Sequence, residues 1–119
     1  MKFLVLYRAP ISAVEQMAKA TPDQAKAGMD AWMTWAEKTR SAIIDLGAPL
    51  GESRATTPSP GGAGSAKIVG YSIIQADSMD AAIELLRDHP HGRVPNFSID
   101  IFECLSMPGE AVIKSSQAA

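Results

Sequence analysis

Two histidines, His89 and His91, flank Pro90 near the predicted end of a helix, and the chain has no others. An imidazole titrates close to neutral pH, so this pair could act as an acid or base, bind a metal or stabilise the carboxyl end of the helix. No third ligand lies nearby in the sequence, and we therefore expect no metal site. His91 is the candidate catalytic residue, with a purely structural place in the turn as the alternative.

Four further polar residues are candidates for ligand binding, namely Arg40, Tyr7, Tyr71 and Asp77. Arg40 projects into the apolar sector of a predicted long helix, from which it could extend to the surface or reach an anionic ligand in a pocket between helix and sheet. The two tyrosines and the aspartate lie on or beside predicted strands that could line the same pocket. The sequence thus predicts a cleft, without a recognisable catalytic motif.

Other residues with chemical potential are interpreted as structural. The run Gly62-Ala63-Gly64-Ser65-Ala66-Lys67 lacks the third glycine of a dinucleotide fingerprint and leads into a strand, so we do not expect it to bind phosphate. Trp32 and Trp35 have a spacing typical of a core or a dimer interface. Cys104, the single cysteine, stands in a strand-like run and is expected to be a small buried hydrophobic residue.

Length and composition exclude several classes of protein. The 119 residues suit one domain with one core, and 46% hydrophobic with 20% charged residues is an average globular composition. With 11 basic and 13 acidic side chains, the net charge of −2 gives no reason to expect a nucleic acid partner. No apolar stretch is long enough to span a membrane, and a lone cysteine forms no intramolecular disulfide. We expect a cytoplasmic protein that needs neither a membrane nor a cofactor.

The first half of the chain predicts one strand and two helices. Residues 2–7 form a short apolar run typical of a core strand. Ser12 opens a capping box that indicates a short helix. A long helix is predicted to begin after Thr21 and to run to about Leu46, where Gly47 would supply a left-handed cap.

The long helix is predicted to pack one apolar face against a sheet. Plotted at 100° per residue, that face contains Met29, Trp32, Met33, Ala36, Ile43 and Leu46. Residues 50–57 predict a weak edge strand, and residues 58–65 predict a loop of turn residues.

The second half predicts a strand, a helix and a final strand. Residues 67–76 are rich in β-branched and aromatic side chains, which favours a strand. Asp77 or Ser78 can cap the following helix, and Pro90 ends it. Residues 97–105 alternate between apolar and polar side chains, as a strand with one covered face does.

The resulting order is strand, helix, weak strand, strand, helix, strand. This order is typical of the ferredoxin-like split βαβ fold, an α+β class with two main helices on one face of an antiparallel sheet. The other sheet face would be bare, and a second copy of the chain could cover it, so we expect a homodimer formed through the sheet faces. Residues 1–107 are expected to form the domain and residues 108–119 a flexible tail.

The chain resembles the YCII-related proteins, including the DGPF-domain branch. The resemblance rests on the residues of Met1–Tyr7, of Trp32–Gly51 and above all of Gly70–Ala82, followed by the His-Pro-His-Gly run that starts at His89. It extends to about Leu105.

That resemblance implies a ferredoxin-like fold of the dimeric α/β-barrel type, a homodimer, and an active-site cleft between sheet and helices. A His and Asp pair is implied as catalytic in some members, but this chain has no histidine in its first half. The Asp-Gly-Pro-Phe motif is also absent, and the loop of prolines and glycines takes its place. Only the pair Pro90 and His91 carries across.

Three functions follow from the sequence. The first is a homodimeric YCII-like domain that binds a small metabolite, which could be anionic, in the cleft. The second is a lyase or isomerase that uses His91 as acid or base, with Arg40 or Tyr71 orienting the substrate. The third is a module without enzymatic activity whose sheet face binds another protein.

Overall fold

The computed structural model describes residues 1–54, 56 and 67–106. The predicted loop 58–65 and the predicted tail 108–119 lie outside the described residues. In chain order the elements are β1 (Lys2–Ala9), α1 (Ala13–Lys19), α2 (Pro22–Lys38), the 3-10 helix η1 (Arg40–Ala42), β2 (Ile43–Asp45), β3 (Lys67–Gln75), α3 (Met79–Leu86), the 3-10 helix η2 (Pro90–Arg93) and β4 (Ser98–Glu103).

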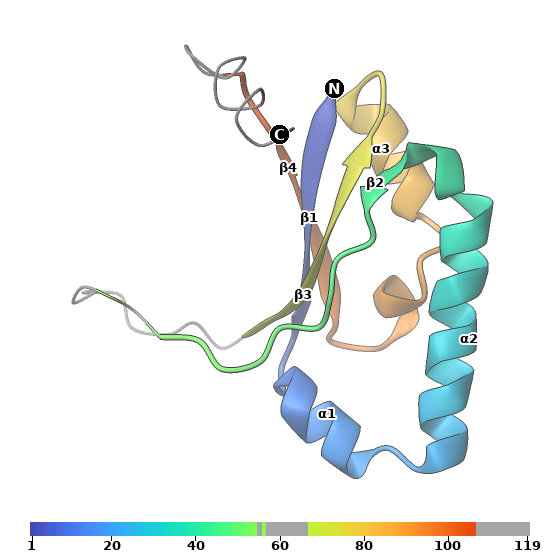
Figure 1. The fold of residues 1–119 in the computed structure, drawn as a ribbon, viewed down its shortest axis with the longest axis vertical. Helices are drawn as coiled ribbons and strands as arrows, with labels where there is room; N and C mark the ends of the chain where they lie inside the picture. Colours follow the sequence, from blue (N-terminus) through green and yellow to red (C-terminus); the bar gives the residue numbers. More distant parts are fainter. Residues whose placement is uncertain (55, 57–66, 107–119) are drawn as a thin grey trace, which may run out of the picture.

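The four strands form one antiparallel sheet in the order β2-β3-β1-β4. The two longest-paired strands, β1 and β3, lie in the middle, and all helices lie on one side of the sheet (Figure 1). This is the ferredoxin-like α+β arrangement, so the predicted fold class is confirmed. Within the described residues, no helix combines the length and the apolar character that crossing a membrane requires.

Each of the three α-helices begins at a residue that the sequence marked as a cap. The Ser12 hydroxyl accepts the Glu15 N–H at the start of α1. Thr21 and Gln24 form a reciprocal capping box at the start of α2, and the Ser78 hydroxyl accepts the Ala81 N–H at the start of α3. These side chains satisfy backbone donors that the first helical turn leaves unpaired.

The long helix is shorter than predicted. α2 ends at Lys38 instead of near Leu46, and the chain continues through η1 into strand β2. Pairing of Ile43 with Ile74 of β3 accounts for this, because a β-branched residue beside a sheet edge gains more from the ladder than from a further helical turn. The predicted edge strand at 50–57 was also wrong for 51–54, since the edge strand is β2.

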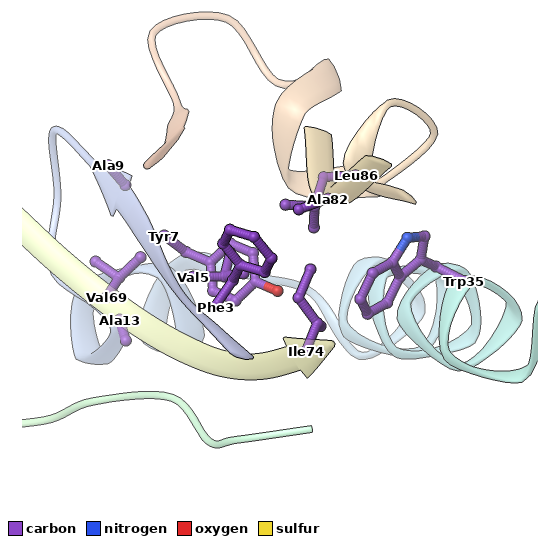
Figure 2. Packing of buried hydrophobic residues seen from close by; sticks show 10 residues of the cluster. All are labelled: Phe3, Val5, Tyr7, Ala9, Ala13, Trp35, Val69, Ile74, Ala82 and Leu86. Atoms are coloured by element: carbon purple, nitrogen blue, oxygen red, sulfur yellow. The ribbon is translucent and has the colours of Figure 1, made fainter. Parts of the chain in front are cut away.

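Alternate residues of β1 face the helices and are buried. Phe3, Val5 and Tyr7 are each at most 1% exposed, and they pack in one cluster with Trp35 of α2 and residues of β3 and α3 (Figure 2). The full cluster comprises Phe3, Val5, Tyr7, Ala9, Ala13, Trp35, Val69, Ile74, Ala82 and Leu86. The core of the domain therefore lies between the sheet and the helices.

Two sequence expectations about burial are corrected by the structure. The apolar face predicted for the long helix included Met29 and Met33, but these side chains are 62% and 51% exposed, and Trp35 is the buried residue of α2 at 3%. Cys104 is exposed, because it follows the end of β4, which is an edge strand.

The opposite face of the sheet carries the other residues of the central strands. Leu6 pairs with Tyr71, and Leu4 pairs with both Ile73 and Phe102, so their side chains share this face. No described helix covers it (Figure 1).

A candidate ligand cavity between helices and sheet

A cavity of about 340 Å³ lies on the helix side of the sheet, near α1 and the middle of α2. Segments that are distant in sequence surround it: β1, the two helices, the chain after β2, the first half of β3, and η2. Its lining residues are Tyr7, Ala13, Gln16, Met17, Met29, Trp32, Met33, Leu46, Gly47, Ala48, Pro49, Val69, Gly70, Tyr71 and His91. Its size is within the range of pockets that hold small organic molecules.

One wall of the cavity is anchored by a short chain of hydrogen bonds. The Tyr7 hydroxyl donates to Ser72 Oγ at 2.9 Å, and Ser72 Oγ donates to the Leu46 carbonyl at 2.6 Å. Burial raises the pKa of Tyr7 to about 12, although its bond to Ser72 opposes this. Tyr7 therefore stays protonated near neutral pH, and its proton holds the wall in place.

The same wall requires a glycine. Gly47 has a φ of 83°, a left-handed conformation, and a side chain there would place its Cβ only 1.7 Å from the Tyr71 carbonyl oxygen. The left-handed conformation predicted for Gly47 is thus confirmed. Gly47 does not cap a helix, however, because α2 ends at Lys38; it allows the chain to approach β3 closely. The Leu50 N–H then donates to the Val69 carbonyl at 3.0 Å, which completes the attachment of residues 46–50 to the sheet.

Methionines form the mouth of the cavity. Met17 of α1 and Met29 and Met33 of α2 all line it, and their side chains are 62%, 62% and 51% exposed. An unbranched thioether adapts easily to an irregular surface, so such a mouth can change shape around a bound molecule. Ala13 is the one buried residue of α1 and Trp35 the one buried residue of α2, so the methionines of the mouth are not held in the core.

His91 borders the cavity as a neutral ring. Its Nε2 lies 2.8 Å from the Arg8 carbonyl, which can only accept, so Nε2 carries the proton. Burial lowers the pKa of His91, although the main-chain carbonyls of Arg8 and Ser98 oppose this shift. The ring is therefore uncharged near neutral pH and is oriented by the main chain.

His89 supports the cavity from behind. It is fully buried, and its ring lies 4.3 Å from Trp32, 4.4 Å from Trp35 and 4.8 Å from Tyr7 between ring centroids. Its Nδ1 accepts the His91 N–H at 3.0 Å, whereas its Nε2 has no hydrogen-bond partner among the described residues. The Trp32 ring is perpendicular to it, which suits a weak N–H···π contact.

Protonation of His89 is strongly disfavoured. Burial, with a smaller contribution from His91, lowers the pKa of His89 to about 3. A charge there would be enclosed by aromatic rings with no acceptor for the second proton. His89 thus acts as an aromatic packing residue in the folded protein.

The structure brings three of the five predicted site residues to the cavity. Tyr7, Tyr71 and His91 all border it, but Tyr71 alternates with Gly70 and Ser72, so its side chain belongs to the opposite face of the sheet. Arg40 lies outside the lining, with its side chain 76% exposed and paired with Glu37.

Asp77 lies outside the cavity as well. It is exposed and borders a separate shallow depression, together with Met1, Ser41 and Gln75.

Sequence reasoning missed the residues that form the mouth and the wall, among them Gln16, Met17 and Ser72. Met29 and Met33 were recognised as apolar helix residues and assigned to the core. The signal that was available is their type, because methionine is the apolar residue best suited to an adaptable surface. The chain after β2 carried no signal, since its position depends on the early end of α2.

The cavity lining contains no residue that is charged at neutral pH. Lysines of α2 form ion pairs outside the lining: Lys38 pairs with Asp88, and Lys26 pairs with Asp30. No cluster of potential metal ligands occurs among the described residues. The site can therefore exclude water, stack rings and donate or accept a few hydrogen bonds.

Comparisons with known proteins show a similar fold and identify no family. No family model matches the chain, and no curated protein matches it. Among solved structures, the chain is similar to 5-chloro-2-hydroxyhydroquinone dehydrochlorinase (TftG) from Burkholderia phenoliruptrix AC1100, in complex with 2,5-dihydroxybenzoquinone. The TM-score is 0.55 at 16% sequence identity, and the match covers 91% of this chain and 97% of that one. This likeness shows a shared fold over nearly the whole length.

Proposed function

We propose that this domain binds a small organic molecule in the cavity between α1, α2 and the sheet. The observation that carries the proposal is a hollow lined by Trp32 and by three methionines that are each more than half exposed. The core beside it consists of buried side chains. A ligand that covers exposed apolar surface of this kind removes it from water, which lowers the free energy of the complex. The wall built on Gly47 and Ser72 gives the cavity a fixed side against which a ligand can pack.

The solved structure of similar fold supports the proposal. TftG was determined with 2,5-dihydroxybenzoquinone bound, so at least one protein with this fold holds a small ring compound. The residues that would bind such a compound here are those of this chain's own cavity.

A ligand screen by thermal unfolding tests the proposal. A ligand that binds only the folded state at one hundred times its Kd stabilises it by about 2.7 kcal/mol. Ala48→Trp should abolish this stabilisation, because Ala48 is an exposed lining residue and an indole there would occupy the cavity. Ala27→Trp, at an exposed position of α2 outside the lining, should retain it. Stabilisation of both variants alike would contradict a site in this cavity.

A catalytic use of the cavity is the second candidate, and it depends on His91. The neutral imidazole at the cavity wall favours it, since only an uncharged ring can act as a base. Catalysis would have to release the Nε2 proton from the Arg8 carbonyl or use the other ring nitrogen. Arg40 takes no part in this version, because it lies outside the lining. Once a ligand that the protein converts is known, His91→Gln should abolish the conversion while ligand binding remains. Unchanged turnover would exclude this role.

We also propose that the chain forms a homodimer through the bare sheet face. The apolar residues Leu4, Leu6, Ile73 and Phe102 share that face. Phe102 is 49% exposed in the single chain, an exposure that a partner would remove.

Sedimentation at micromolar concentration tests the dimer. The wild-type chain should sediment as a dimer and Phe102→Lys as a monomer, whereas Met79→Lys, on the helix side, should remain dimeric. A monomeric wild-type chain would favour the third function, a face that binds another protein.

A further inference from the structure

We infer that the cavity takes an uncharged, largely apolar molecule with about one hydroxyl-sized polar group, and that it discriminates against anions. This inference rests on the proposed function and specifies its ligand. It replaces the anionic metabolite that Arg40 suggested in the sequence.

The first argument is the absence of compensating charge. Every lining residue is uncharged at neutral pH, including His91, whose pKa burial lowers. A carboxylate that left water for this cavity would lose its hydration and meet no cation there, which is costly in free energy. Arg8, although its carbonyl contacts His91, directs its guanidinium to Asp100 instead.

The second argument is the character of the mouth. Met17, Met29 and Met33 offer polarizable sulfur and methyl groups, and Trp32 adds an aromatic ring beside them. Thioethers make favourable contacts with aromatic rings, and a flat ligand could also pack on the indole. These residues select for apolar surface and particularly for a ring.

The third argument is the small number of available hydrogen-bonding groups. Gln16 donates from Nε2 to the Ile11 carbonyl at 3.1 Å, which fixes the amide and leaves its oxygen without a partner among the described residues. The Trp32 indole N–H likewise has no acceptor among them, and both side chains are partly buried and line the cavity. The Gln16 oxygen and the Trp32 N–H together match a single hydroxyl group, and His91 Nδ1, which carries no proton, is a further acceptor on a lining residue.

The experiment is a titration of the full chain, labelled with ¹³C at the methionine methyl groups, followed by NMR at pH 7. Benzyl alcohol and benzoate are the probes, because they share a ring and differ in charge. The methyl signals of Met17, Met29 and Met33 should shift with benzyl alcohol, and benzoate should bind at least about tenfold more weakly. Met79, which lies outside the cavity, is the internal reference and should not shift.

A charge placed at the mouth sharpens the test. Met29→Lys should improve benzoate binding about two- to fivefold, the effect of one partly exposed charge pair. Met29 is 62% exposed, so the folded state tolerates this change. Met79→Lys is the matched control and should leave benzoate binding unchanged.

Two results would overturn the inference. Benzoate that binds the wild-type chain as tightly as benzyl alcohol would overturn the ligand class and leave small-molecule binding intact. Absence of any shift at the three methyl groups with either probe would overturn it as well; the proposed function would fall only if the wider thermal screen also found no stabilisation that Ala48→Trp removes.

Discussion

The two ends of the layer between helices and sheet differ sharply in how they are filled. At one end, Trp35 packs with Ile74, Ala82 and Leu86, and each is at most 7% exposed (Figure 2). At the other end the same helix α2 presents Met29, which is 62% exposed over a cavity. One helix thus stabilises the fold through Trp35 near its end and lines the cavity through Met29, Trp32 and Met33 in its middle turns.

This difference shows how a small domain can separate stability from binding. The packed end supplies the buried apolar area that holds the sheet and helices together. The cavity end leaves apolar surface uncovered, a cost in stability that a ligand can recover. The aromatic cluster around His89 lies at the junction and contacts both tryptophans.

The largest expected effect on stability comes from removing a buried side chain at the packed end. Trp35→Ala should lower the free energy of unfolding by about 3–5 kcal/mol, because it removes a buried indole and leaves the Leu85 carbonyl without its donor. Met33→Ala, at the open end, should cost less than about 1 kcal/mol. Urea unfolding measures both. Equal costs would show that the two ends are packed alike.

The next effect concerns the wall of the cavity. Gly47→Ala should destabilise the protein by about 3 kcal/mol, because a side chain would strain the left-handed backbone and collide with the Tyr71 carbonyl. Gly28→Ala in α2 is the contrasting substitution: apart from the adjacent residues and the local helix backbone, nothing lies within 4 Å of its Cβ position, so better helix propensity should stabilise by about 0.5–1 kcal/mol. Thermal unfolding of the two variants should shift in opposite directions; a shift in the same direction would contradict this description of the wall.

A smaller effect is a pH dependence of stability that arises from His89, which lies between the packed end and the cavity. Unfolded His89 takes up its proton near pH 6.5, but folded His89 does so only near a pKa of about 3. Between these values the unfolded state binds more protons, so stability should fall as the pH falls, by about 1.4 kcal/mol per pH unit. This dependence should be about half as steep at pH 6.5 and should vanish about one pH unit higher, where the unfolded His89 is also neutral.

Urea unfolding at pH 7, 6 and 5 measures this dependence. His89→Asn keeps an acceptor for the His91 N–H but cannot titrate, so its stability should fall less over this range. Equal slopes for the two proteins would place the titration elsewhere.

Much of the fold could be predicted from local sequence signals. Ser12, Thr21 and Ser78 cap their helices as expected, since a cap depends on a few neighbouring residues. The end of α2 could not be predicted in the same way. Ile43 and Ile44 continue a helical apolar pattern, and only the presence of β3 beside them makes a strand more favourable.

The site was less predictable than the fold. Tyr7 and His91 were identified because tyrosine and histidine are chemically distinctive residues, but the same reasoning selected Arg40, which is exposed and paired with Glu37. Periodicity placed Met29 and Met33 on an apolar face without saying whether anything fills the space in front of it. That depends on where residues 46–49 lie, and those are positioned by contacts with β3.

The most direct test of the central claim is to locate a bound ring by nuclear Overhauser effects in the full-length chain. With benzyl alcohol present, the ring protons should show cross-peaks to the methyl groups of Met17, Met29 and Met33, and none to Met79. Cross-peaks confined to Phe102 or other residues of the bare sheet face would contradict the account, because they would place the ligand on the opposite side of the sheet from the cavity.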